Sequence, residues 1–105
     1  MPYRCMVRIS FGQVGRSLTE DERATNVEKF KVLAQEWQKA GIRLIGTFGN
    51  SAHPGGYAHE LLLEVNNYDD VGLIDRGLMR EIKFESHQVD FGTTRGWAEK
   101  CWDDA

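Results

Sequence analysis

The stretch that most constrains the fold of this chain runs from residue 57 to residue 65 and reads Y-A-H-E-L-L-L-E-V. Successive side chains of a strand point to opposite faces, so one face takes the odd-numbered, largely apolar residues. The other face takes Ala58, Glu60, Leu62 and Glu64. An apolar face beside a face with two carboxylates predicts a central strand in a sheet that helices cover on one side only. The function then depends on what covers the other side.

A first strand and a first helix precede this stretch. Residues 3–11 alternate as a strand whose polar face carries Arg4, Met6, Arg8 and Ser10. Residues 12–17 contain two glycines and are expected to form a loop. Thr19 and Glu22 form a capping box, and Gly41 is a natural stop, so a helix is predicted between them. Its apolar stripe is Ala24, Val27, Phe30, Leu33, Ala34 and Trp37.

Three further elements complete the pattern. Residues 42–48 alternate as a strand, with Leu44 and Phe48 on the apolar face and Arg43, Ile45 and Thr47 on the polar one. A second helix follows residue 67, capped by Asn67 or Asp69, with an end between residues 80 and 87. The residues it turns inward are Val71, Ile74, Leu78 and Ile82. A last strand over residues 89–95 places Asp90, Gly92 and Thr94 on its polar face.

The resulting order is strand, helix, strand, strand, helix, strand. This order predicts an α+β, ferredoxin-like βαββαβ domain over residues 1–95, with a four-stranded antiparallel sheet ordered 4-1-3-2 and both helices on one face. Residues 96–105 form a tail with Trp97 and Trp102. Two tryptophans in a terminal segment indicate that it docks on its own domain or on a partner subunit.

Residues 3–95 resemble the dimeric α/β-barrel superfamily. The resemblance lies in the capped helix, in G-I-R-L-I-G-T-F-G at residues 41–49 with the glycine-rich hairpin after it, and in Y-A-H-E-L-L-L-E-V-N-N-Y-D-D at residues 57–70. It implies a homodimer in which two sheets pair through their open faces and enclose a cavity. The superfamily includes cofactor-independent monooxygenases, isomerases, cyclases and haem enzymes. The resemblance includes no catalytic signature and identifies no subfamily.

Composition excludes several classes of protein. The net charge is −3 and the basic residues are scattered, so no nucleic-acid partner is expected. No apolar run is long enough to span a membrane, and the N-terminus does not read as a signal peptide, which leaves the cytoplasm as the expected location. Cys5 is expected to be a buried, inert thiol, and its spacing from Cys101 indicates no metal site. We expect neither a metal nor another cofactor.

The candidate site lies on the open sheet face. The first strand is expected to run parallel to the third and antiparallel to the fourth, which would bring Arg8, Glu64 and Asp90 together. The other candidates for substrate binding are Arg4, Glu60, Arg43 and His53. His87 is a candidate general base at the cavity mouth, whereas His59 is expected at the edge of the core. The alternative interpretation of these charges is cross-strand pairing on a solvated sheet face.

These residues favour a small-molecule enzyme that transfers protons without a cofactor, as an isomerase, cyclase or lyase does. Arg8 would anchor an anionic, carboxylated or aromatic substrate, and Asp90, Glu64 or His87 would act as acid and base. A cofactor-independent monooxygenase on the same scaffold is one alternative, and oxygen uptake distinguishes it. The other is a non-catalytic module that binds a ligand or only dimerises through this face.

Overall fold

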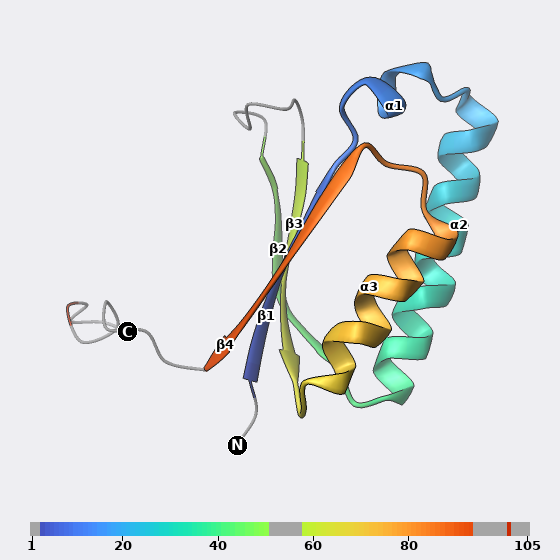
Figure 1. Ribbon diagram of the computed structural model, residues 1–105. Coiled ribbons are helices and arrows are strands. Elements are labelled where there is room, and N and C mark those ends of the chain that lie inside the picture. The colour runs from blue at the N-terminus through green and yellow to red at the C-terminus, as the bar shows by residue number, and fades with distance from the viewer. Residues whose placement is uncertain (1–2, 51–57, 94–100, 102–105) are drawn as a thin grey trace.

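Four strands and three helices make up the described part of the chain, residues 3–50, 58–93 and 101 of a computed structural model (Figure 1). In chain order they are β1 (Tyr3–Ser10), α1 (Gly12–Ser17), α2 (Glu20–Lys39), β2 (Arg43–Asn50), β3 (Ala58–Val65), α3 (Asp69–Glu81) and β4 (Ser86–Thr93). The sheet order is β2-β3-β1-β4, which is the predicted 4-1-3-2 order, and α2 and α3 cover one face. The ferredoxin-like fold is confirmed.

All three strand pairs are antiparallel, including β1 with β3. The expectation that the first and third strands run parallel was wrong. In a βαββαβ chain the crossover makes β1 parallel to β2, and β3 returns antiparallel to β2, so β3 is also antiparallel to β1. The register therefore sets Arg8 opposite Glu60 and Arg4 opposite Glu64.

The predicted first helix is present as α2, with both of its end signals. The Thr19 side chain accepts from the Glu22 backbone N–H, and the Glu22 carboxylate accepts from the Thr19 N–H, so the capping box is complete. Hydrogen bonds from Lys83 and Thr19 lower the pKa of Glu22 to about 2. Beyond Ala40, Gly41 takes a φ of 88°, a conformation that favours glycine, and the helix stops there.

The expected loop over residues 12–17 is instead the short helix α1. Gly12 begins it with a φ of 46°, a conformation that favours glycine, and a Cβ there would lie 1.9 Å from the Glu85 carboxylate, which would have to move. The backbone N–H of Gln13 donates to that carboxylate at 3.3 Å. Glu85, which lies just before β4, thus holds the turn between β1 and α1.

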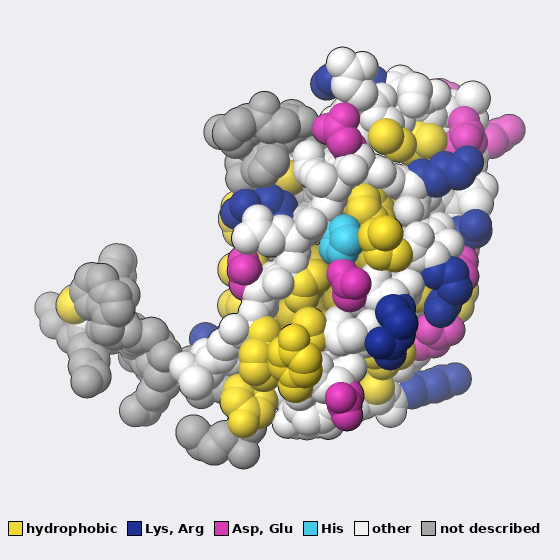
Figure 2. Space-filling model, viewed as in Figure 1, with side chains coloured by type: hydrophobic (Ala, Val, Ile, Leu, Met, Phe, Trp, Pro, Cys, Tyr) yellow, Lys and Arg dark blue, Asp and Glu magenta, His cyan; other side chains and the backbone are white. Residues whose placement is uncertain are grey.

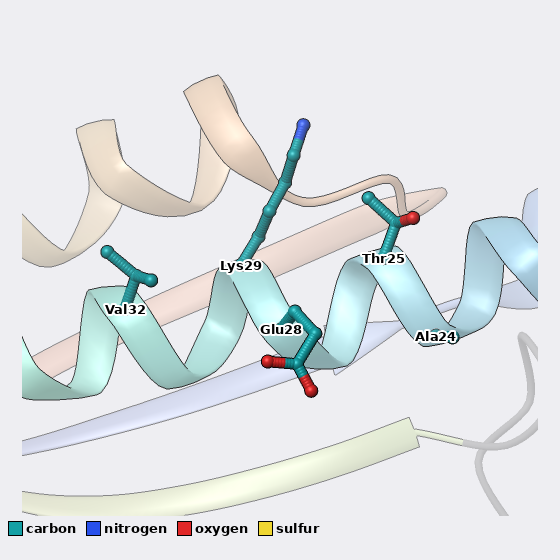
Figure 3. A pocket seen from close by; sticks show the side chains of 5 residues that line it. All are labelled: Ala24, Thr25, Glu28, Lys29 and Val32. Atoms are coloured by element: carbon teal, nitrogen blue, oxygen red, sulfur yellow. The ribbon is translucent and has the colours of Figure 1, made fainter.

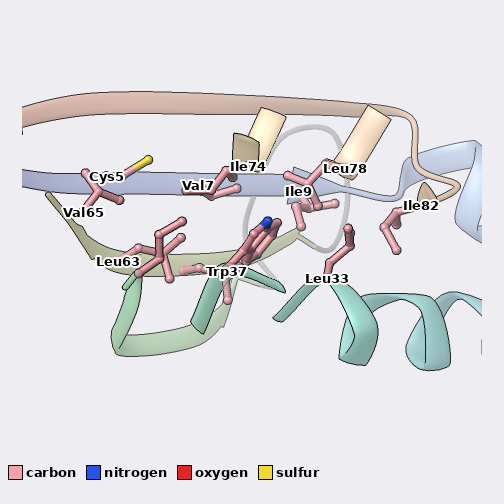
Figure 4. Close-up of a cluster of buried hydrophobic side chains, with 12 residues drawn as sticks. Cys5, Val7, Ile9, Leu33, Trp37, Leu63, Val65, Ile74, Leu78 and Ile82 are labelled. Carbon is pink, nitrogen blue, oxygen red and sulfur yellow. The ribbon is translucent and has the colours of Figure 1, made fainter. Parts of the chain in front are cut away.

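The core lies between the sheet and the two long helices (Figure 4). Its buried members are Cys5, Val7, Ile9, Leu33, Trp37, Ile42, Leu61, Leu63, Val65, Ile74, Leu78 and Ile82. Helices α2 and α3 approach closely at Gly77, where a Cβ would lie 2.9 Å from a methyl carbon of Leu33. Cys5 is buried as expected, and this burial raises the pKa of its thiol to about 11, which disfavours the reactive thiolate.

A β-bulge in β2 changes which side chains face the helices. Leu44 pairs with Leu63 and Gly46 with Leu62, so Ile45 is an extra residue in the ladder. From Gly46 onward each residue therefore lies on the face opposite to the one predicted. Phe48 pairs with Glu60 on the open face, whereas Thr47 turns to the helix side and donates to the Glu60 carbonyl at 2.9 Å.

The last strand also begins earlier than residue 89. Strand β4 starts at Ser86, because α3 ends at Glu81 and leaves only a short connection. Neither Asn67 nor Asp69 caps α3; instead, the Asp70 carboxylate accepts from the backbone N–H groups of Asn66 and Asn67, at 3.0 and 3.3 Å. Residues 94 and 95 of the predicted strand and the tail segments 96–100 and 102–105 lie outside the described residues.

The space-filling view shows hydrophobic side chains gathered near the lower end of β4 (Figure 2). The rings of Tyr3 and Phe91 lie 4.9 Å apart there, and Tyr68 meets Phe91 edge to face at 5.3 Å. Among the described helices, none is long and apolar enough to cross a membrane. Cys5 and Cys101 are both free thiols.

Candidate functional site

Three rows of side chains that run across the strands carry the charged groups of the open sheet face. The upper row is Phe48, Glu60, Arg8 and Gln88. The middle row is Gly46, Leu62, Met6 and Asp90, and the lower row is Arg43, Glu64, Arg4 and Gly92. Directly opposed side chains in an antiparallel sheet lie close enough to interact, so these rows decide which charges meet.

In the upper row, Arg8 and Glu60 form the best-buried ion pair of this face. The Arg8 Nε donates to Glu60 Oε1 at 2.7 Å, and only 4% of the Glu60 side chain is exposed, against 38% for Arg8. A carboxylate this buried is stable as an anion only when a cation or several donors compensate its lost hydration. Arg8 thus neutralises the charge of Glu60 within the protein.

In the lower row, Arg43 is committed to Glu64 in the same way but nearer the solvent. Arg43 Nη2 lies 2.8 Å from Glu64 Oε1, and 68% of the Arg43 side chain is exposed. The alternative interpretation made from the sequence, cross-strand charge pairing, therefore applies to these four residues. Each of these arginines already has an anion beside it.

Arg4 and Asp90 differ from these pairs. Within the described residues, Arg4 has no carboxylate partner, and Asp90 has no cationic one; Asp90 accepts only from the Gln88 amide, with both contacts at 3.3 Å. Gly92 lies opposite Arg4 and two residues beyond Asp90. A Cβ at Gly92 would meet nothing within 4 Å, so the space above this position is open.

The predicted grouping of Arg8, Glu64 and Asp90 is not formed. The antiparallel register places Arg8 four residues along β1 from Arg4, which lies opposite Glu64, and Arg8 faces Glu60 and Gln88 instead. Asp90 lies diagonally beside both Arg8 and Arg4. His53 lies outside the described residues.

His87 lies on the opposite side of the sheet from its predicted position. It pairs with Ile9 on the helix-covered face, and its Nε2 lies 2.5 Å from Asp75 Oδ1 of α3. The reason is the earlier start of β4, which makes His87 a strand residue. His87 therefore joins β4 to α3 and does not reach the open face.

A second hollow, which sequence reasoning missed, lies between α2 and the β2–β3 edge of the sheet. We call it the helix-side trough. Its middle part has a volume of about 390 Å³, its α1 end about 500 Å³, and its far end about 90 Å³. Its principal lining residues are Phe11, Val27, Phe30, Leu44, His59 and Leu61. The apolar stripe of α2 indicated the residues that line this trough. The sequence did not show that part of the stripe stays uncovered, because this depends on how α2 packs on α3.

His59 lies where the middle part and the α1 end of the trough meet. The Phe11 ring lies edge-on to its imidazole, with the ring centres 5.5 Å apart. Partial desolvation lowers the pKa of His59, so the ring is neutral over a wider pH range than a fully solvated histidine. This agrees with the predicted core-edge position of His59.

Another depression, of about 320 Å³, lies on the outer surface of α2 alone (Figure 3). Its lining residues are Ala24, Thr25, Glu28, Lys29 and Val32. All of them come from one helix, so no second element closes the depression. Within the described residues, no group of three or more histidines, cysteines and carboxylates is arranged to hold a metal ion.

Comparisons with known proteins give no family for this chain. No protein-family model matches it, and no curated protein matches it. Among solved structures, it is similar to one described as an unknown protein from Galdieria sulphuraria, with a TM-score of 0.46 and 14% identity. The match covers 90% of this chain and 45% of that one, so this chain spans less than half of that structure's length.

Proposed function

We propose that this protein is a homodimeric, cofactor-independent enzyme of the dimeric α/β-barrel type, which transfers a proton within a small carboxylated molecule. The observation that carries the proposal is the open position above Gly92, beside a cation and a carboxylate that form no ion pair with the described residues. A second copy placed over the open face would close this space and exclude water, which strengthens electrostatic interactions inside it.

In the proposed site, Arg4 binds the carboxylate of the substrate. A guanidinium offers paired donors that match the geometry of a carboxylate. Asp90 then removes a proton from the carbon next to a carbonyl group and returns it at another carbon, so the reaction is an isomerisation with no net oxidation. Diagonal neighbours across an antiparallel pair are about 7–8 Å apart, which leaves room for a small substrate between Arg4 and Asp90.

Arg4 thus takes the anchoring role that the sequence analysis gave to Arg8, and of the acid/base candidates Asp90, Glu64 and His87 the proposal keeps Asp90. Arg8 and Arg43 hold Glu60 and Glu64, and these pairs support the sheet and shape the walls of the site. The same pairs favour a second candidate function, a non-catalytic binding module, because most charges of the face already neutralise one another. In that case Arg4 would still bind an anion, but Asp90 would transfer no proton.

The test begins with a thermal-shift screen against small aromatic and aliphatic carboxylic acids. A ligand at 100 times its Kd stabilises the folded state by about 2.7 kcal/mol. Gly92→Val should abolish the response, because it fills the open space, while Gly46→Val is the matched control, since that position is equally open on the other edge strand. An equal response in both variants would place the ligand elsewhere.

Turnover of the acid found in the screen then separates the two candidate functions. Asp90→Asn keeps the shape of the side chain but removes the base, so binding should persist while proton exchange at the substrate carbon, followed by NMR in deuterated water, should stop. Exchange at the wild-type rate in Asp90→Asn would exclude Asp90 as the base. Binding without exchange in the wild-type protein would establish the non-catalytic module.

A further inference from the structure

We propose that the helix-side trough is a second ligand site, which binds a linear alkyl carboxylate such as a medium-chain fatty acid. The alkyl chain would lie between α2 and the β2–β3 edge, and its carboxylate would lie at the α1 end. This site is on the opposite face of the sheet from the position above Gly92, so it is independent of the proposed function.

The shape of the trough is elongated. Its middle part shares Phe30, Leu44 and Leu61 with the far end, and it shares Phe11, Val27 and His59 with the α1 end. The lining residues of α2 extend from Arg23 to Gln38, which corresponds to roughly 22 Å of helix. A volume of this size lies within the range of ligand sites, and its length suits a chain better than a compact ring.

The wall of the trough consists mainly of apolar side chains, and part of this apolar surface is exposed. Leu44 and Val27 are 58% and 55% exposed, although both lie beside the core. Two polar side chains of the wall have partners outside the trough: Asn26 exchanges two hydrogen bonds of 3.0 Å with the Lys83 backbone, and Thr47 donates to the Glu60 carbonyl. Most of the other lining residues offer hydrocarbon or aromatic surface, so burying an apolar chain there is favourable.

The charge at the trough has one sign. Arg16 and Arg23 line the α1 end and Lys31 lines the middle part, whereas no aspartate or glutamate lines any of the three parts. Lys31 is paired with Glu28 at 3.2 Å. Arg16 and Arg23 have no carboxylate partner within the described residues, and Arg23 contacts only the Gly15 carbonyl, at 3.4 Å. Two uncommitted guanidinium groups at one end of an apolar trough match the carboxylate of an amphipathic anion.

The binding experiment uses decanoate, hexanoate and decylammonium below their micelle concentrations, measured by isothermal titration calorimetry on the full chain. Decanoate should bind more tightly than hexanoate, by up to roughly fourfold per methylene that is fully buried. Decylammonium should bind at least tenfold more weakly than decanoate, because its charge meets cations (about 1.4 kcal/mol per tenfold). Equal affinity for decanoate and decylammonium, or no binding of decanoate, would overturn the proposal.

The chain offers a matched pair of variants on α2. Val27→Glu places a carboxylate inside the trough, whereas Val32→Glu places one on the outer surface of the same helix, and the two valines are 55% and 54% exposed. Val27→Glu should abolish decanoate binding, and Val32→Glu should leave it unchanged. An equal loss in both variants would mean adsorption to the surface and would contradict the trough.

Two further variants test whether Arg16 and Arg23 bind the carboxylate and on which face of the sheet decanoate binds. Replacing Arg16 and Arg23 together by alanine should weaken decanoate binding at least about tenfold, since each supplies a charged hydrogen bond. Gly92→Val should leave decanoate binding unchanged. If Gly92→Val loses decanoate binding and Val27→Glu keeps wild-type affinity, decanoate binds at the open face. That result would overturn this proposal and would leave the proposed function standing.

Discussion

Arg8 and Arg43 each hold a glutamate on the same sheet face, but they differ in what their removal will cost. Glu60 is almost fully buried, so Arg8→Met leaves a carboxylate without compensation and should lower the free energy of unfolding by about 2 kcal/mol. Arg43→Met breaks a more exposed pair and should cost less than about 1 kcal/mol. Urea unfolding of both variants checks this. Equal costs would mean that burial of Glu60 does not control the energy of its pair.

His59 gives the protein a pH dependence whose sign follows from its environment. Burial lowers its folded-state pKa, so between about pH 6.5 and that lower value the unfolded chain binds more protons than the folded one. The stability contributed by neutral His59 is therefore lost as the pH falls below about 6.5. His59→Gln should flatten this part of the profile in urea unfolding between pH 8 and pH 5. A wild-type slope in His59→Gln would assign the effect to other groups.

The two glycines of α3 differ in their surroundings although they occupy one helix. A Cβ at Gly77 would lie 2.9 Å from buried Leu33, so Gly77→Ala should destabilise the protein by about 1 kcal/mol or more, despite the better helix propensity of alanine. At Gly72 a Cβ would meet only the flexible Arg76 side chain, so Gly72→Ala should stabilise by about 0.5–1 kcal/mol. Thermal unfolding of both checks the opposite signs, and shifts of the same sign would contradict the account.

The bulge in β2 predicts an unusual tolerance to deletion. Removing Ile45 leaves Leu44 opposite Leu63 and Gly46 opposite Leu62, so the ladder becomes regular and every other side chain keeps its face. The deletion variant should fold with a native circular dichroism spectrum. Deleting Leu62 from the central strand β3 is the control, because it turns half of that strand to the wrong face and should prevent folding. An unfolded Ile45 deletion would mean that the bulge itself is required.

The sequence predicted the elements well where local signals act, and less well where pairing decides. Thr19, Glu22 and Gly41 delimited α2, because capping depends on a few neighbouring residues. The sheet faces of Thr47 and Phe48 were predicted wrongly, because strict alternation along the sequence assumes a regular strand and does not reveal the extra residue of a bulge. His87 was misplaced for a related reason: the start of β4 depends on where α3 ends. The partner of Arg8 depends on the strand directions, which follow from topology, and the parallel direction expected for the first and third strands was wrong.

At the scale of the whole molecule, the proposed dimer makes a prediction of its own. Phe48 is exposed on the open face, so Phe48→Glu should convert a dimer to a monomer by introducing a charge into the interface. Val32→Glu adds the same charge on the outer surface of α2 and should leave the dimer intact. Light scattering coupled to size exclusion measures the molar mass directly. A wild-type protein that is monomeric at all concentrations would refute the dimer.

The bulge at Ile45 also bears on how two copies of this chain would meet in the proposed dimer. β2 is one edge of the sheet, and a bulged edge twists away from the flat geometry that a neighbouring strand needs for pairing. Pairing of edge strands leaves a new free edge on each added copy, so it can continue and build a fibre. Pairing of two sheet faces uses the same face of both copies, so the assembly stops at a dimer. One additional residue in a strand of eight thus favours finite assembly over polymerisation.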